Sequence, residues 1–166
     1  MELLSRTGSI FSGTFSGAAA DRGGVLLSGG GGDTTAPTLT SPTGAATGST
    51  TATGSVTTDE DGPAWAVLTT SATTPDDDQI KAGQDHTGAA AAASDTATLS
   101  AGSNPAAFSF SGLAASTAYY LHIVQEDEAS PTPNTATPVT SSSFTTSGGS
   151  SVGAAAHYYS HMSGEQ

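Results

Sequence analysis

Three runs of acidic residues are the part of this chain best suited to chemistry. They are Asp59-Glu60-Asp61, Asp76-Asp77-Asp78 and Glu126-Asp127-Glu128. Hard cations such as Ca²⁺ bind where several carboxylate and carbonyl oxygens converge. The middle run is explained by the start of a helix, because aspartates favour the positive end of a helix dipole. The two outer runs therefore remain as candidates for a cation site.

The two outer runs would meet if both loops lie at the same end of a β-sandwich, with Asp33 nearby. For that arrangement we expect a weak Ca²⁺ site formed by Asp59, Asp61, Glu126 and Asp127. The alternative is a solvated acidic rim that binds nothing. The spacing of an EF-hand loop is not present in the sequence.

Other kinds of catalytic or metal site find little support in the sequence. His157 and His161 have the i, i+4 spacing of a helical metal pair, but no third ligand follows, and His122 is expected at the surface. There is no Gly-x-Ser-x-Gly nucleophile elbow. The glycines at 29–32 lack the Lys and Thr of a phosphate-binding loop. We therefore expect a protein that is not an enzyme and needs no cofactor.

The charge and composition exclude several classes of partner. Three basic and fifteen acidic residues give a net charge of −12, so nucleic acid is not expected to bind. The chain has no cysteine, and no run of apolar residues approaches the length that spans a membrane. The first residues lack the features of a secretory signal peptide. We expect synthesis in a host cytoplasm and no membrane partner.

Alternating apolar residues and turn signals predict an all-β fold. Ser, Thr, Gly and Ala dominate, and short apolar runs recur at the spacing of an antiparallel sandwich of about seven strands. Thr43-Gly44 and Thr47-Gly48 are expected to form turns, and Trp65 and Val67 to share one strand face. The clearest strands are expected at 51–58, 64–70, 96–101, 108–113, 119–125 and 139–145.

One short inserted helix is expected after the strand at 64–70. Thr74 is predicted to cap it, Pro75 to take its first position and Gly83 to end it. The sandwich is expected to span residues 33–147, between an N-terminal arm at 1–32 and a C-terminal tail at 148–166.

The densest apolar stretch resembles a corner found in fibronectin type III domains. In that family a Leu precedes an inward-facing Tyr by six residues, as Leu113 precedes Tyr119 here, and alternating apolar residues follow. The resemblance implies an Ig-like or fibronectin-III-like sandwich in which the Tyr119 hydroxyl bonds back to the corner backbone. The family's usual Pro-Gly in this turn is replaced by Ala115-Ser116, and its strand-B Trp is absent.

A narrower resemblance covers about two-thirds of the chain. The run from Asp33 through 80–91 to Phe144 is similar to modules appended to phage and prophage structural proteins, with Ile80–Ala91 as its most specific part. The resemblance implies a module of a virion surface.

The two ends carry apolar residues among Gly, Ser and Ala. Such segments can become ordered on another chain, and a floppy leader is the alternative. The predicted anchoring residues are Leu3, Leu4, Ile10, Phe11, Phe15, Val25, Leu26 and Leu27. Aromatic residues and Met are favoured in interfaces, so Tyr158, Tyr159 and Met162 are a candidate tail interface, with disorder as the alternative.

These features lead to one leading hypothesis and two alternatives. The leading hypothesis is a phage capsid decoration protein of the head-fibre or cement type, located in the virion. Its partners would be the major capsid protein or other virion subunits, copies of itself and, weakly, bacterial surface glycans. The alternatives are a carbohydrate- or receptor-binding module of a tail fibre or adhesin, for which Tyr120 is the named aromatic, and a tail-tube or baseplate component.

Overall fold

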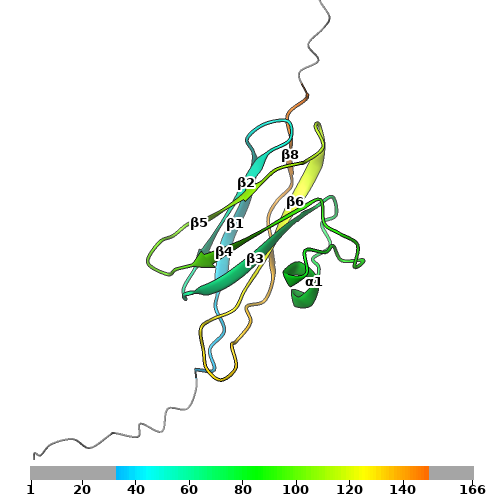
Figure 1. Cartoon of the computed structure of the whole chain (residues 1–166). Helices are drawn as coiled ribbons and strands as arrows, with labels where there is room; N and C mark the ends of the chain where they lie inside the picture. Colours follow the sequence, from blue (N-terminus) through cyan, green and yellow to red (C-terminus); the bar gives the residue numbers. More distant parts are fainter. Residues whose placement is uncertain (1–32, 150–166) are drawn as a thin grey trace, which may run out of the picture. The chain divides into compact units, whose positions relative to one another are not determined.

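A computed structural model describes residues 33–149, which form two antiparallel β-sheets packed face to face (Figure 1). The smaller sheet has the order β1-β2-β5, and the larger has the order β4-β3-β6-β7, with β8 also paired to β6. The expected all-β sandwich is confirmed. The strands are β1 Leu39–Ala46, β2 Ala52–Thr58, β3 Gly62–Thr69, β4 Ala93–Leu99, β5 Ala106–Phe110, β6 Ala118–Gln125, β7 Val139–Thr140 and β8 Phe144–Thr145.

The main core lies between the two sheets and follows from the period-two alternation of their strands. Val56 on β2, Phe108 on β5 and Leu121 on β6 are all buried there. Full burial of such a side chain stabilises the fold by roughly 1.5–3 kcal/mol. This core positions the loops at both ends of the sandwich.

A second, smaller core lies on the outer face of the larger sheet. Val67 of β3, Val124 of β6 and Ile80 of the helix α1 (Asp77–Lys81) are buried together, and Trp65 packs beside them. The expectation that Trp65 and Val67 share a face is confirmed. That face is covered by α1 instead of by the second sheet (Figure 1).

The helix begins later than the sequence predicts, so Pro75 lies before the cap and not in the first helical position. Asp76, not Thr74, is the N-cap: its carboxylate accepts a hydrogen bond from the backbone N–H of Gln79 at 2.8 Å, and the Gln79 side chain accepts the N–H of Asp76 at 2.9 Å. This reciprocal capping box satisfies two backbone donors, whereas Thr74 could satisfy only one. Gly83, at a φ of +71°, follows the helix as expected.

A predicted turn and a predicted strand differ from the structure, while the ends of the other predicted strands are displaced by up to three residues. Thr43-Gly44 lies inside β1, next to a shift of register between Thr40 and Thr43, so the turn predicted there is wrong. The strand predicted at 139–145 is divided into β7 and β8, because Ser141 between them bonds the Leu121 backbone with its own N–H and hydroxyl. No helix among residues 33–149 has the length and apolarity needed to cross a bilayer.

The corner before β6 is held by a tyrosine hydroxyl. The backbone N–H of Ala114 donates to the hydroxyl oxygen of Tyr119 at 3.0 Å, and Leu113 is buried beneath it. The Tyr119 ring also packs against Phe144, with ring centroids 6.3 Å apart. The corner predicted from this stretch is therefore present.

We expect Tyr119→Phe to destabilise the fold by about 1–2 kcal/mol, because the variant keeps the ring but leaves the Ala114 N–H without its acceptor. Urea denaturation followed by circular dichroism measures the change. Tyr120→Phe is the matched control, since the half-buried Tyr120 makes no hydroxyl hydrogen bond within residues 33–149. Equal losses in the two variants would contradict the role assigned to the corner.

Candidate functional site

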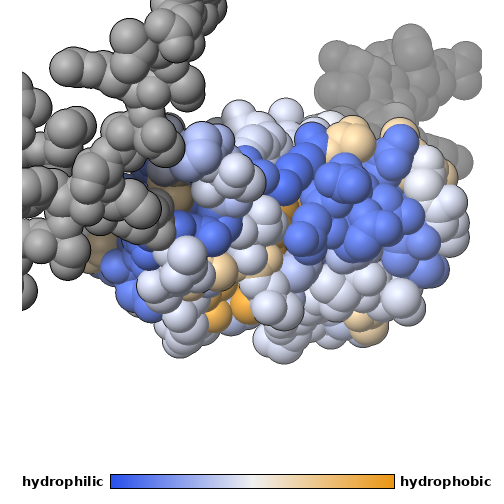
Figure 2. Space-filling model, turned by 90° about the horizontal axis from the view of Figure 1, so that it is seen from below, coloured by the Kyte–Doolittle hydropathy of each residue, from blue (hydrophilic) through white to orange (hydrophobic). Residues whose placement is uncertain are grey.

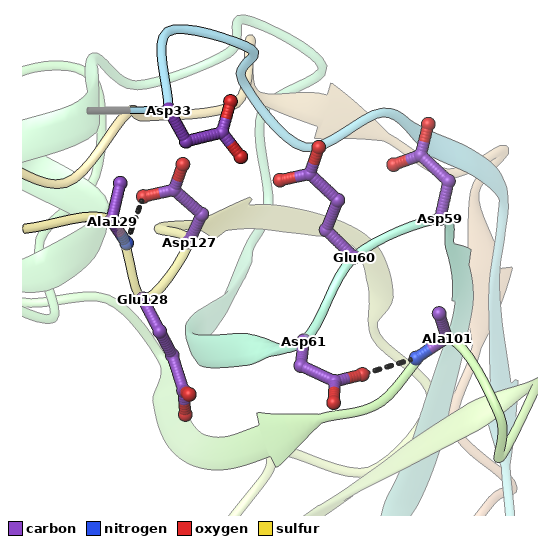
Figure 3. Close-up of a pocket in the computed structure, with 8 residues that line it drawn as sticks. All are labelled: Asp33, Asp59, Glu60, Asp61, Ala101, Asp127, Glu128 and Ala129. Atoms are coloured by element: carbon purple, nitrogen blue, oxygen red, sulfur yellow. Dashed lines mark hydrogen bonds between the residues drawn. The ribbon is translucent and has the colours of Figure 1, made fainter. Parts of the chain in front are cut away.

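The candidate site is an acidic hollow at one end of the sandwich (Figure 3). The β2–β3 loop supplies residues 59–61, the segment after β6 supplies residues 127–129, and Asp33 lies beside them. The hollow measures about 520 Å³ and is open to solvent. Figure 2 shows this end of the body as an area rich in hydrophilic residues. The two acidic runs therefore lie at one end of the fold, as the sequence suggests.

Three carboxylates converge in the hollow. One oxygen each from Asp33, Glu60 and Asp127 lies within 4.8 Å of the others, and this is the only such acidic or histidine group in residues 33–149. Asp127 is only 5% exposed. Its carboxylate accepts hydrogen bonds from the backbone and side chain of Asn134, each at 2.7 Å, and from the Ala129 N–H at 3.0 Å. These bonds fix the direction of the Asp127 side chain.

Only one of the four predicted Ca²⁺ ligands belongs to this trio. Asp59 accepts the Thr38 N–H at 2.6 Å, and Asp61 accepts the Ala101 N–H at 2.8 Å. Glu126 forms an ion pair with Lys81 at 2.6 Å. Asp127 is the shared member, while Asp33 and Glu60 were not assigned as ligands from the sequence. The acidic runs alone could not show which side chains have structural partners.

A buried polar pair supports the acidic loop from below. The Thr58 hydroxyl donates to the Gln125 side-chain oxygen at 2.6 Å, and the Gln125 amide donates to the Glu60 carbonyl at 2.8 Å. Both side chains are buried between the sheets at this end. The sequence predicts Gln125 only as the last residue of a strand. It does not predict the hydrogen bonds of Gln125, because one polar residue in a strand does not indicate which distant residue it will contact.

The crowding of negative charge has a clear effect on Glu60. Burial raises the pKa of Glu60, and the neighbouring charges of Asp33, Asp59 and Asp127 raise it further. The pKa of Asp59 is lowered by its hydrogen bonds from Thr38. Burial alone would raise the pKa of Asp127, but the bonds from Asn134 and Ala129 lower it below its usual value. Glu60 is therefore the member whose charge the hollow disfavours.

We expect Glu60→Gln to raise the melting temperature at pH 7 by about 2 °C in the presence of a chelator. The folded protein holds the Glu60 proton more tightly than the unfolded chain, so ionised Glu60 opposes folding above its folded pKa. The gain should shrink as the pH falls through that folded value and vanish below the usual value of 4.5. Thermal scans at several pH values measure it, with exposed Glu128→Gln as the control. A gain that persists at pH 3.5 would contradict this account.

The arrangement could hold a hard cation, and the Ca²⁺ hypothesis remains a prediction. If Ca²⁺ binds at the trio, millimolar Ca²⁺ should raise the melting temperature by a few degrees, because a ligand that binds only the folded state stabilises it. Asp127→Asn should remove that rise, whereas Asp76→Asn, at the helix cap, should not. The absence of any heat or stabilisation with millimolar Ca²⁺ would leave the solvated acidic rim as the correct alternative.

His122 is a buried residue, so the surface position expected for it is wrong. It does lie on the face opposite Leu121 and Ile123, but it is 0% exposed. Its Nδ1 lies 2.8 Å from the Thr140 hydroxyl, and its Nε2 lies 3.0 Å from the Thr69 hydroxyl and 3.2 Å from the Ser71 carbonyl. Alternation showed the face correctly but could not show that residues 71–74 and β7 cover it.

Several predicted residues lie outside the described part of the chain. These are the anchoring residues of the arm, Tyr158, Tyr159 and Met162 of the tail, and the two tail histidines. Comparisons of the chain with protein-family models, with curated proteins and with solved structures find no significant match.

Proposed function

We propose that this chain is a non-enzymatic structural protein of a phage virion, and specifically a capsid decoration protein whose sandwich body is displayed on the particle. Its N-terminal arm would anchor it to the major capsid protein or to another virion subunit. If several copies are joined in a homo-oligomer, their linked arms would make the attachment multivalent. Synthesis in the host cytoplasm precedes assembly in this proposal.

The observation that carries the proposal is the self-contained body. Every buried side-chain nitrogen and oxygen in residues 33–149 has a hydrogen-bond partner. The buried polar groups of the body therefore need no partner chain to satisfy them. The Tyr119 corner supports the finer likeness to fibronectin type III and Ig-like modules. The run at 80–91, similar to phage structural modules, supports the virion location.

The test uses the full chain with point changes in the arm. Phe11→Ser together with Phe15→Ser should abolish co-sedimentation of the chain with empty shells of the phage that encodes it, because the anchoring apolar surface is lost. Ser12→Ala together with Ser16→Ala, next to the two phenylalanines in the same arm, is the matched control. Circular dichroism of both variants verifies that the body stays folded. Shell binding that survives the double change would overturn the anchoring proposal.

A second candidate function is favoured by one specific observation. The alternative of a carbohydrate- or receptor-binding module needs an aromatic residue accessible on a strand face, and Trp65 is half-buried beside a surface hollow. Tyr120, the aromatic named from the sequence, is also half-buried but lines none of the hollows described for residues 33–149. Binding of the full chain to arrayed bacterial surface polysaccharides would support this second function. Absence of binding to all of them would exclude it.

A further inference from the structure

The outer face of β3 and β4 carries a small surface formed by four residues. Pro63 is paired with Thr98, and Trp65 is paired with Thr96, so all four side chains point to the same side of the sheet. We call these residues the Trp65 tile. They line a hollow of about 330 Å³ together with Ala64 and Ala97. β4 is the edge strand of its sheet, and Asp95 on it accepts a hydrogen bond from the Ser109 N–H of β5 at 2.8 Å.

The tile has the dimensions of a single sugar ring. Residues two apart on a strand are separated by about 6.8 Å, and paired residues on neighbouring strands by about 5 Å. A tile of four side chains is far smaller than a protein interface, which buries roughly 800 Å² on each partner. Its size therefore favours a compact ring over a folded partner.

Trp65 is held in place before any ligand arrives. β3 lies between β4 and β6, and Trp65 packs against the buried cluster beneath α1. The Lys81 ammonium lies over one face of the Trp65 ring, 5.7 Å from its centroid, and Lys81 is itself paired with Glu126. A ring fixed in this way loses little conformational entropy on binding, which favours recognition of weak ligands.

The two threonines of the tile supply hydroxyl groups that can bind sugar hydroxyls. Thr96 and Thr98 are exposed, and their hydroxyls make no hydrogen bond within residues 33–149. Each free hydroxyl can both donate and accept, as sugar hydroxyls require. No member of the tile is charged, and the net charge of −12 opposes the approach of an anionic polymer. The lining therefore matches a neutral, hydroxylated ring with one apolar face.

We propose that the Trp65 tile binds a neutral hexopyranose unit of a bacterial surface polysaccharide. The C–H face of the sugar would lie on the part of the indole that Lys81 leaves open, and its ring hydroxyls would bond to Thr96 and Thr98. This inference rests on the second candidate function and is independent of shell anchoring. A single-ring site of this kind binds weakly, with a dissociation constant on the order of 1 mM.

The chain contains its own reporter, because Trp65 is its only tryptophan. Titration of the full chain with cellotriose, maltotriose and chitotriose should give a saturable change in tryptophan emission for at least one of them. Thr96→Val and Thr98→Val should each weaken that binding by about threefold to tenfold, because one hydrogen bond is lost. Thr53→Val, an exposed threonine on β2 in the other sheet, is the matched control.

Trp65→Ala removes both the site and the fluorescent reporter. Saccharide binding to this variant is therefore measured from the amide NMR shifts of residues 96 and 98. The same spectrum shows whether the body is folded. The shifts seen with the wild type should disappear. If none of the three saccharides moves the wild-type emission or those amides at about 10 mM, the proposal is overturned. If Trp65→Ala still binds arrayed polysaccharides as the wild type does, the tile inference fails while the second function stands. If the wild type binds none of them, both fail.

Discussion

Replacing Gly62 with alanine should destabilise the body by about 3–5 kcal/mol, the largest effect that we expect from a single added methyl group. Gly62 has a φ of +149°, in a region that essentially only glycine adopts. A Cβ at this position would also overlap the carbonyl oxygen of Glu126, far inside van der Waals contact. Because that oxygen belongs to the backbone, it cannot move away as the end of a side chain can.

The position of Gly62 links this prediction to the candidate site. Gly62 follows the acidic loop of residues 59–61, and Glu126 precedes Asp127. A backbone shift at their contact would separate Glu60 from Asp127, so any stabilisation by Ca²⁺ should be lost as well. Urea denaturation with and without Ca²⁺ measures both effects.

Gly88→Ala is the matched control for Gly62→Ala. Gly88 also has a positive φ, at +83°, but an added Cβ there would meet no atom within 4 Å. We expect a cost of about 1–2 kcal/mol from the backbone conformation alone. If the two alanine variants lose the same stability, the contact with Glu126 is not what requires glycine at position 62.

The second large effect concerns His122, whose stability contribution should depend on pH. Thr69 donates its hydroxyl proton to the Ser71 carbonyl, so its oxygen can only accept from His122 Nε2–H. His122 Nδ1 is then the acceptor for the Thr140 hydroxyl. These partners assign a neutral imidazole with its proton on Nε2.

Burial lowers the pKa of the His122 imidazole below its usual value of 6.5, the bond to Ser71 opposes this, and nearby His86 lowers it further. The unfolded chain therefore binds the proton more readily than the folded protein. Stability should be greatest above pH 6.5 and should fall as the pH drops towards the lowered value, by at most about 1.4 kcal/mol per pH unit.

His122→Gln should remove this dependence and cost about 2–3 kcal/mol at pH 7.5, because a smaller side chain leaves a gap and unmade hydrogen bonds. Urea denaturation between pH 7.5 and 5.5 measures the slope, with Glu60→Gln present in every variant so that the raised pKa of Glu60 does not contribute. His86→Gln, at an exposed position, should keep most of the slope because burial is the main cause of the shift. Identical slopes in the wild type and His122→Gln would contradict the assignment.

Much of the layout could be predicted because it depends on local patterns. The alternation around Phe108 and Tyr119–Val124 places strands correctly, since successive strand residues point to opposite faces. The spacing of Leu113 and Tyr119 predicts a corner that the hydroxyl bond at Ala114 confirms. The approximate helix position follows from the aspartates of its first turn, whereas the predicted cap at Thr74 and the predicted first position at Pro75 are too early.

The candidate site could be predicted only in outline. Two acidic runs at the ends of strands suggest one acidic end, because loops at the same end of a sandwich are close. The ligand set is different from the predicted one, because Asp59, Asp61 and Glu126 have partners from segments distant in sequence. A sequence shows which residues carry charge but not which charges are already neutralised or hydrogen-bonded.

The sequence by itself determined the all-β class, the strand faces and the acidic end, because period-two alternation and loop composition are local properties. Only the tertiary structure decided that α1 and residues 71–74 cover the outer face of the larger sheet. The layer formed by α1 and residues 71–74 buries His122 and leaves Trp65 half-buried beside Thr96 and Thr98. The physical reason is that alternation distinguishes the two faces of a strand, whereas burial depends on which distant segment packs against each face.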